Sequence, residues 1–279
     1  MRYGIILTCG DAADVAELAK DAEDAGWDAV FGWEPVFGVH AWVALTAAAM
    51  RTSTIRLGTM LTPLPRWKPW DLASVTGTLD RLSGGRVILG VGLGAVMQHW
   101  TAFEPDQGRA VRAELMDEGL DVLFGLWGDQ PFSYDGKHWT VRPPEAMVPP
   151  PIVSRPRIPT WCVGLAGARK SVRRAARCDG LLPNFPGDGG PGEARQDYAR
   201  WAAVTAEISD LRAELGLTGP YDIVSEGTAD LVDRDRTVEE AARYAEVGAT
   251  WWLDADWAAA PTDDPVAALR ERVLAGPPR

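Results

Sequence analysis

The fold of this chain is decided by residues 55–94, which read IRLGTMLTPLPRWKPWDLASVTGTLDRLSGGRVILGVGLG. The apolar run 55–61 is too short for a stable helix and is bounded by turn residues, which favours a strand buried on both faces. Apolar residues at helical spacing then predict a helix over 69–82, and Gly84 stops it because glycine tolerates a left-handed C-terminal cap. A second buried strand is expected over 87–93. This order predicts a right-handed parallel crossover.

The same alternation of strands and helices continues along the whole sequence. Eight strands are expected, at residues 3–8, 28–33, 55–61, 87–93, 158–165, 180–182, 221–225 and 249–253. Helices are expected at residues 12–25, 40–51, 69–82, 108–127, 168–177, 191–215, 238–247 and 265–275. Eight such units predict an α/β fold, a (β/α)8 TIM barrel with residues 1–279 as a single domain. An open doubly wound sheet is the alternative, but eight units favour closure.

Residues 128–159 interrupt this alternation between the fourth and fifth strands. They contain a hairpin-like piece with Asp135-Gly136 as its turn signal, and then a proline-rich run. A loop of this length inside a compact domain is usually a lid or an insertion. We therefore expect residues 128–159 to form an insertion within the barrel.

The composition is that of an ordinary soluble globular protein, with 46% hydrophobic and 24% charged residues. The net charge of −11 disfavours nucleic acid or an anionic membrane as a partner, because nothing offsets the phosphate repulsion globally. Three scattered cysteines do not suggest disulfides or zinc, and no ligand set follows the strands, so no metal is expected. The sequence shows no signal peptide and no long apolar span, which predicts a cytoplasmic protein.

Barrels place their active sites at the carboxyl ends of the strands, so the residues that follow each strand are the candidates. Glu34 follows the second strand between Trp33 and Pro35. Partial burial there would raise its pKa toward general acid–base use, while a solvated or ion-paired loop glutamate is the alternative. His99 follows the fourth strand and is the second catalytic candidate, although a lone histidine beside Trp100 is more often structural.

The chain has 13 tryptophans, and several fall at predicted strand ends. Aromatic side chains at a barrel mouth could flank a planar ring and an apolar substrate. The candidates for the substrate pocket are Trp33, Trp67, Trp100 and Trp252. Because Trp251 and Trp252 are adjacent in a strand, one of them faces the barrel and the other faces the helices.

A phosphate site is predicted in the turn after the fifth strand. That turn contains Gly164, Leu165, Ala166 and Gly167. It leads into a helix, whose N-terminus offers free N–H groups and a partial positive charge. Arg169 adds local positive charge in a protein that is otherwise acidic. A plain turn with solvated basic residues is the alternative.

Residues 55–94 also carry a resemblance to a known family. TLDRLSGGRVILGVGLG, preceded by LGTMLTPLP, is similar to the luciferase-like monooxygenase superfamily, whose members use FMN or the deazaflavin coenzyme F420. Later pieces agree in order, namely MDEGLDVLFGLW, FSYDGKHWTV, IPTWCVGLAG, ARCDGLLP and VGATWWLD. The resemblance implies an oxidoreductase acting on a small organic substrate, by monooxygenation with reduced FMN or by hydride transfer with F420. It also implies a possible homodimer through the early barrel helices.

The resemblance assigns roles to particular residues. Thr59, Met60 and Leu61 lie where many members carry a non-proline cis peptide that supports the central ring of the cofactor, here expected at Met60–Leu61. Residues 164–169 would help to hold the cofactor phosphate, with Leu165 replacing the second glycine of the family pattern. Residues 128–159 would cover the active-site mouth. The remaining candidates for cofactor contact, at the end of the fourth strand, are Gly92 and Gly94.

Glu34-Pro35 stands where the superfamily often has Asp-His. The acidic residue is kept in type, but the neighbouring histidine is absent. F420-dependent sugar-phosphate dehydrogenases rely on that histidine, so its absence argues against their particular chemistry. A non-catalytic flavin-binding barrel is the alternative function.

Overall fold

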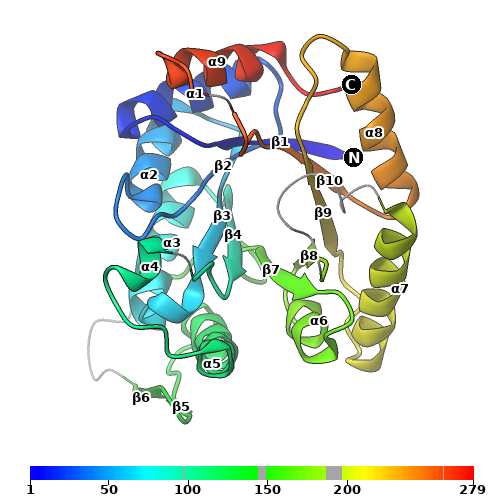
Figure 1. Cartoon of the computed structure of the whole chain (residues 1–279). Coiled ribbons are helices and arrows are strands. Elements are labelled where there is room, and N and C mark those ends of the chain that lie inside the picture. Colours follow the sequence, from blue (N-terminus) through cyan, green and yellow to red (C-terminus); the bar gives the residue numbers. More distant parts are fainter. Residues whose placement is uncertain (97, 144–148, 187–196, 260) are drawn as a thin grey trace.

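Eight parallel strands form a closed barrel in the computed structural model of this protein (Figure 1). The structure describes residues 1–96, 98–143, 149–186, 197–259 and 261–279, without the side chains of Gln98 and His99. The barrel strands are β1 (Arg2–Leu7), β2 (Ala29–Gly32), β3 (Arg56–Pro63), β4 (Val87–Gly92), β7 (Thr160–Leu165), β8 (Gly180–Asn184), β9 (Asp222–Gly227) and β10 (Trp251–Asp254). Their order is β1-β10-β9-β8-β7-β4-β3-β2, and β2 pairs with β1 to close the ring. The predicted (β/α)8 barrel is confirmed.

Helices surround the barrel and cover its outer face (Figure 1). They are α1 (Ala12–Asp24), α2 (Ala41–Arg51), α3 (Pro69–Ser83), α4 (Gln98–Thr101), α5 (Arg109–Trp127), α6 (Arg169–Ala176), α7 (Tyr198–Glu214), α8 (Arg234–Glu246) and α9 (Pro265–Ala275), with the 3-10 turn η1 (Leu64–Arg66). Gly84 ends α3 in the left-handed conformation, with a φ of 70°. The first residues of the helix predicted over 191–215 lie outside the described residues. Where the chain is described, no helix is both long enough and apolar enough to cross a membrane.

Aromatic rings fill the centre of the barrel. Phe31 and Trp161 have ring centroids 5.4 Å apart, and those of Trp161 and Trp251 are 5.1 Å apart. Gly58 makes room for these rings, since a Cβ atom there would lie 2.6 Å from the Phe31 ring and 2.7 Å from the carbonyl oxygen of Ile88. The barrel interior is therefore a packed core, and any ligand site has to lie at one of its ends.

Trp252 points away from this interior. Its side chain is fully buried in the layer between the strands and the helices, and it lines no part of the cavity described below. Successive side chains of a strand alternate between its two faces, and Trp251 takes the inward position. The prediction that Trp252 lines the substrate pocket is wrong.

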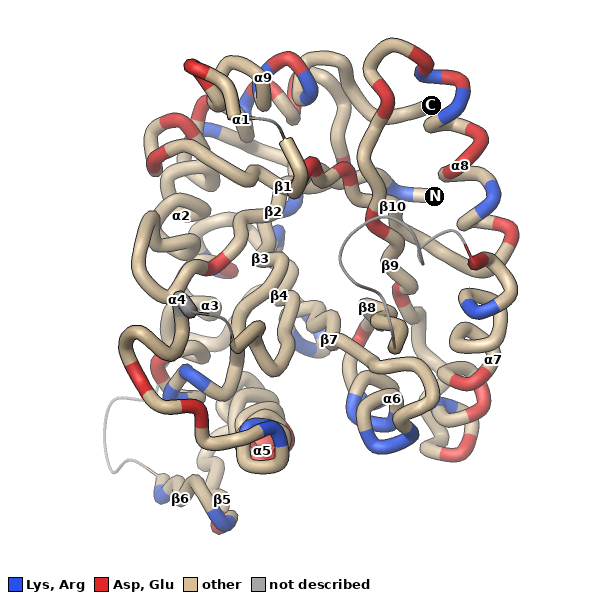
Figure 2. The backbone as a smooth tube through the Cα atoms, in the orientation of Figure 1, with Lys and Arg blue, Asp and Glu red and all other residues tan. Residues whose placement is uncertain are grey.

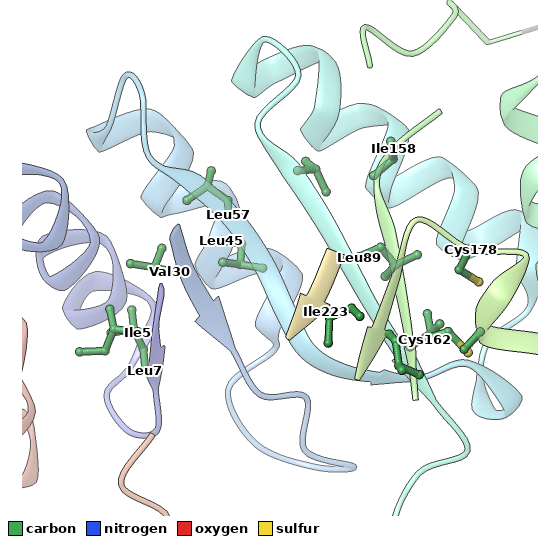
Figure 3. Close-up of a cluster of buried hydrophobic side chains, with 14 of the residues drawn as sticks. Ile5, Leu7, Val30, Leu45, Leu57, Leu89, Ile158, Cys162, Cys178 and Ile223 are labelled. Atoms are coloured by element: carbon green, nitrogen blue, oxygen red, sulfur yellow. The ribbon is translucent and has the colours of Figure 1, made fainter. Parts of the chain in front are cut away.

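Apolar side chains on the outside of the barrel pack against the helices (Figure 3). Strand residues and a residue of α2 meet in this layer, among them Ile5, Val30, Leu57, Leu89 and Leu45. Cys162 and Cys178 belong to the same layer as buried free thiols. Each large apolar side chain that is buried contributes about 1.5–3 kcal/mol. The continuous layer therefore holds the helices, and the loops before them, in fixed positions.

The described residues of segment 128–159 lie along the outer side of α3 and α5. The hairpin of β5 (Tyr134–Asp135) and β6 (Thr140–Val141) is held by Glu118 of α5, whose carboxylate accepts the backbone N–H groups of residues 137–139 at 2.8, 2.9 and 3.0 Å. Trp139 then packs edge-on against Trp70 of α3, with ring centroids 5.5 Å apart. The hairpin is thus attached outside the ring of helices (Figure 1).

This position corrects the expectation for residues 128–143 and 149–159, which do not cover the barrel mouth, while residues 144–148 lie outside the described residues. The segment leaves from the end of α5 and returns to the start of β7, and both lie at the barrel end opposite to the carboxyl ends of the strands. The carboxylate of Asp80, near the end of α3, holds the returning chain by accepting the N–H groups of Val153 at 2.7 Å and Ser154 at 2.9 Å. None of the described residues of this segment lines the mouth cavity.

Candidate active site

A cavity of about 560 Å³, here called the mouth cavity, opens at the carboxyl ends of the barrel strands. Its walls come from residues that end or follow β2, β3, β4, β7, β8 and β10. Its volume falls within the range of about 300–1,000 Å³ that is typical of small-molecule sites. Because TIM barrels carry their active sites at this end, the mouth cavity is the candidate active site.

The last residues of β3 form one wall of the mouth cavity. A cis peptide bond joins Met60 and Leu61, at the position predicted from the sequence. Met60 and Leu61 line the cavity together with Gly92 of β4. Thr59 and Thr62 are fully buried and do not line it. Of the three residues predicted here for cofactor contact, Met60 and Leu61 can therefore touch a ligand, whereas Thr59 cannot.

Glu34 lines the mouth cavity and is held by two hydrogen-bond donors. Its Oε1 accepts the indole N–H of Trp67 at 2.6 Å, and its Oε2 accepts the hydroxyl group of Thr62 at 2.8 Å. Burial raises the pKa of Glu34, and Thr62, Trp67, His40 and the indole of Trp42 oppose this rise only in part. Glu34 therefore keeps its proton to a higher pH than an exposed glutamate does.

A second cavity of about 390 Å³, here called the side cavity, adjoins the mouth cavity at Glu34. Its polar lining includes Glu34, His40 and Arg66, and Trp67 belongs to it as well. Trp67 does not line the mouth cavity, which corrects its predicted place in the substrate pocket. Its indole N–H is instead used to hold the Glu34 carboxyl group.

Three tryptophans line the mouth cavity: Trp33, Trp100 and Trp257. The ring of Trp100 is nearly fully buried, and the guanidinium carbons of Arg66 and Arg112 lie 5.3 and 5.7 Å from its centroid. Trp257 lines the cavity beside the end of β10, where Trp252 was predicted to line it. It follows the end of β10, where the strand alternation no longer turns the side chain toward the helices. Trp33 and Trp100 line the cavity, and their contact with a substrate stays a prediction.

His99 lies on α4, after β4. Its side chain is outside the part of the chain that the structure describes, so its catalytic role stays a prediction. Gly92 and Gly94 both line the mouth cavity, at the end of β4 and in the loop that leads to α4.

Basic side chains meet the mouth cavity where α5 and α6 lie side by side, and Figure 2 shows basic residues gathered on α6. Arg109 and Arg112 come from the start of α5, and Ser171 and Arg174 come from α6. Sequence reasoning did not select these four residues. Each pair is three residues apart, and residues at this spacing share a helix face. That spacing was the signal that could have found them.

Several polar groups in this region have capacity left for a ligand. Arg174 is 7% exposed, and its Nε and Nη2 bind Asp117 at 2.6 and 2.8 Å, while Nη1 bonds to no described residue. Arg109 has no hydrogen-bond or ion-pair partner among the described residues. The hydroxyl oxygen of Ser171 accepts the N–H of Leu165 at 3.0 Å, which leaves the hydroxyl hydrogen to be donated. These donors suit an anionic group.

Arg169 does not take part in this arrangement. Its side chain is 65% exposed and pairs with Glu214 of α7 at 2.9 Å, away from the lining of the mouth cavity. Of the turn before α6, only Leu165 lines the cavity. Gly164, Ala166 and Gly167 are absent from its described lining. Arg169 is therefore not placed to meet a ligand in the mouth cavity, and the phosphate site itself stays a prediction.

Comparison with known proteins identifies a family. The sequence model of the family described as luciferase-like monooxygenase matches residues 3–279. A putative coenzyme F420-dependent oxidoreductase of Mycobacterium tuberculosis is 31% identical over 225 residues, which cover 71% of this chain and 63% of that protein. An F420-dependent glucose-6-phosphate dehydrogenase of Beutenbergia cavernae is 33% identical over 172 residues, 58% of this chain and 49% of that protein. The chain thus spans less than two thirds of the length of these relatives.

Solved structures share the fold. A monooxygenase from Streptomyces bottropensis has a TM-score of 0.79 and 20% sequence identity, and the match covers 99% of this chain and 98% of that one. At this level of identity the similarity establishes the barrel architecture only.

Proposed function

Because the chain belongs to the luciferase-like monooxygenase family, we propose that it is an oxidoreductase that uses FMN or coenzyme F420 to transform a small organic substrate. The observation that carries the proposal is that the mouth cavity has an apolar wall and a separate cationic region. One wall, at Met60 and Leu61, is apolar, and the region between α5 and α6 is cationic. A cofactor with a flat ring and a phosphate group matches both parts.

The phosphate would be held between α5 and α6 in this proposal. The free Nη1 of Arg174, the unpaired guanidinium of Arg109 and the hydroxyl hydrogen of Ser171 are donors without a described acceptor. Guanidinium groups suit phosphate oxygens because their N–H groups match the oxygen geometry. Arg174 is also fixed in place by Asp117, so it loses little freedom when it binds an anion.

The ring would rest against Met60 and Leu61. Bound FMN in its reduced form would supply electrons to molecular oxygen, whereas bound F420 would exchange a hydride with the substrate. The protein itself would exclude water and would donate or accept protons. Trp33, Trp100 and Trp257 enclose the space beside this wall, and the carboxyl group of Glu34 lies at its edge. Glu34 is therefore proposed as the general acid or base, with its raised pKa in support.

Titration of the purified protein with FMN, and separately with F420, tests this proposal. Trp33, Trp100 and Trp257 line the cavity, so binding is expected to quench tryptophan fluorescence. Binding of FMN alone would favour monooxygenation and lead to an assay of oxygen consumption. Binding of F420 alone would favour hydride transfer, which is followed through the absorbance of the cofactor without oxygen. If neither binds, the proposed cofactor is wrong, and binding without turnover would favour a non-catalytic flavin-binding barrel.

We also propose a homodimer formed through α2 and α3. These helices expose apolar side chains, including Val43 and Met50 on α2 and Leu82 on α3. Exposed apolar surface of this kind favours association. Light scattering on the purified chain of 30.2 kDa should give twice the monomer mass. A monomer mass at micromolar concentration would remove this part of the proposal. A cytoplasmic location stays a prediction.

A further inference from the structure

A chain of hydrogen-bonding groups, here called the hydroxyl chain, runs from Glu34 into the barrel wall. Oε2 of Glu34 lies 2.8 Å from Oγ1 of Thr62, and Oγ1 of Thr62 lies 3.0 Å from Oγ1 of Thr59. Oγ1 of Thr59 then lies 3.3 Å from the carbonyl oxygen of Gly90. Both threonines are fully buried, so water does not replace a lost partner. The chain ends at a carbonyl group, which can only accept.

The local strand pairing creates this chain. The register between β3 and β4 shifts between Thr59 and Thr62, so the two threonines approach each other on one side of the strand. Gly90 of β4 lies at this irregularity, and a Cβ atom there would collide with the carbonyl oxygen of Thr59. A glycine at this position therefore permits the close approach of β3 and β4 that brings Thr59 within reach of the Gly90 carbonyl.

The hydroxyl hydrogen of Thr62 has two acceptors within reach, Oε2 of Glu34 and Oγ1 of Thr59. A threonine hydroxyl donates one hydrogen bond, so the two bonds are alternatives. When Glu34 is ionised, Thr62 donates to Glu34 and Thr59 can donate to Thr62. When Glu34 carries a proton on Oε2, it donates to Thr62, Thr62 donates to Thr59, and Thr59 donates to the Gly90 carbonyl. Every buried hydrogen has an acceptor in both arrangements.

We propose that Thr62 and Thr59 are positioning residues that keep Glu34 fully hydrogen-bonded in both of its protonation states. The carboxyl group can then release and regain one proton while two hydroxyl hydrogens rotate, and no heavy atom has to move. A buried polar group left without a partner is strongly unfavourable, so a chain that avoids this in both states removes a barrier to proton exchange. This inference deepens the proposed role of Glu34 and rests on it.

The hydrogen bonds of the other groups around Glu34 do not change direction when Glu34 gains or loses its proton. The indole N–H of Trp67 can only donate, so its bond to Oε1 persists in both states. His40, before α2, and Arg66, in η1, share the side cavity with Glu34, and Arg66 is paired with Glu104 at 3.0 Å. The hydroxyl chain is therefore the part of the surroundings whose hydrogen bonds change direction when Oε2 gains or loses a proton.

Two near-isosteric substitutions should move the pKa of Glu34 in opposite directions. Thr62→Val removes the donor to the ionised carboxylate and should raise the pKa by about one unit. Thr59→Val leaves that donor in place but removes the acceptor that Thr62 needs when Glu34 is protonated. Thr62 then has to donate to Glu34, which favours the ionised form, so the pKa should fall by about one unit.

Infrared difference spectroscopy of the cofactor-free protein over a range of pH measures this directly. The C=O stretching band of protonated Glu34 is identified by its loss in Glu34→Gln. Thr62→Ser and Thr59→Ser keep the hydroxyl groups and should restore the wild-type titration. Thr76→Val is the matched control, because it removes a fully buried hydroxyl in α3 that bonds only to helix carbonyls. It should leave the pKa of Glu34 unchanged.

Shifts of opposite sign, with rescue by serine, support the proposal. Shifts of the same sign, or an unchanged titration in Thr59→Val, overturn it. Thr59→Ala is a second variant with the same expected sign, in case valine at this position disturbs the strand. Because the measurement needs neither FMN nor F420, a failure of cofactor binding would contradict the proposed function while leaving the result for the hydroxyl chain intact.

Discussion

The indole N–H of Trp257 donates a hydrogen bond to Oε1 of Glu226, with 2.6 Å between the two atoms. Trp67 and Glu34 are joined in the same way and at the same distance. In each case a carboxylate at the end of one strand fixes an aromatic side chain of a later loop. The partners are distant in sequence, so the loops around the mouth are tied together by side chains as well as by the barrel itself.

Loss of the Glu226 carboxylate should loosen the Trp257 wall of the mouth cavity. In Glu226→Ala the indole loses this acceptor, and we expect cofactor binding to weaken by about three- to tenfold, the range of a single modest hydrogen bond. The dissociation constant from tryptophan quenching measures this. Glu226→Gln keeps an acceptor oxygen and serves as the control, with binding close to wild type. Wild-type binding in Glu226→Ala would show that Trp257 needs no such support.

Glu34→Gln tests whether Glu34 acts as a general acid or base in the mouth cavity. The amide keeps the size and the partners of Glu34 but cannot exchange a proton, so turnover should fall by ~100-fold or more. The dissociation constant of the cofactor should change little, because the donors assigned to its phosphate lie on α5 and α6. Steady-state rates and quenching titrations separate the two effects. Unchanged turnover would make Glu34 a structural residue.

The same variant should change how stability depends on pH. Burial raises the pKa of Glu34 above its ordinary 4.5, so the folded protein binds this proton more tightly than the unfolded chain does. As the pH rises from about 4.5, the wild type therefore loses stability relative to Glu34→Gln, until the pH passes the folded pKa. Thermal unfolding of both proteins from pH 4 to pH 9 measures the difference. A wild type that gains stability relative to Glu34→Gln as the pH rises over this range would contradict the raised pKa.

Arg174 and Arg169 make a matched pair for the phosphate site. Arg174→Ala removes a buried cation from the lining of the mouth cavity and should weaken cofactor binding by about 10- to 100-fold. Arg169→Ala removes an exposed cation that pairs with Glu214, and binding should stay near wild type. Isothermal calorimetry on both variants gives the comparison. Equal losses in the two variants would mean that only the overall charge matters.

The order of the elements was predictable because each barrel strand is buried on both faces and reads as a short apolar run between turn residues. The run predicted at 87–93 is β4, Val87–Gly92, and the helix predicted at 69–82 is α3, Pro69–Ser83. Glu34 could be chosen because its place after β2 follows directly from this order. These conclusions needed only local patterns and the known location of barrel active sites.

The predicted positions that the structure corrects depend on the direction of a side chain or on a partner that is distant in sequence. Local sequence patterns contain neither kind of information. The pair Trp251 and Trp252 showed that one ring faces inward, but not which one. Arg169 and Arg174 lie on the same short helix, but Arg169 pairs with Glu214 of α7 and Arg174 pairs with Asp117 of α5. Neither acidic partner is near in sequence. The outward course of segment 128–159 likewise depends on Glu118 and Asp80, two carboxylates whose roles follow only from the folded arrangement.

Gly58 offers a test of how tightly the barrel centre is packed. A methyl group in Gly58→Ala would lie 2.6 Å from the Phe31 ring and 2.7 Å from a β4 carbonyl oxygen, so the ring and strands would have to shift. Overpacking of this kind costs about 1–3 kcal/mol. Urea unfolding should show a lower midpoint with an unchanged slope. Gly219→Ala, where a Cβ atom meets nothing within 4 Å, is the control and should unfold like the wild type.

Glu23 gives a pH dependence of the opposite sign to that of Glu34. Burial opposes its ionisation, but hydrogen bonds from the N–H groups of residues 53–55 and the hydroxyl of Thr54 outweigh it and lower its pKa from 4.5 to about 2. The ionised group therefore stabilises the loop that leads into β3 at pH values above about 4.5. That contribution is lost as the pH falls from 4.5 toward 2.

Glu23→Gln should accordingly be less stable than the wild type near neutral pH, by about 1 kcal/mol once solvent screening is allowed for. The gap should close as the pH is lowered, because the wild-type carboxylate then takes up a proton and loses its advantage. Urea unfolding at pH 7, 4 and 3 measures it. Asp24→Asn, which breaks only an exposed pair with Lys20, should show little effect at any of these values. A gap in Glu23→Gln that stays constant with pH would mean that the carboxylate acts through its shape and not through its charge.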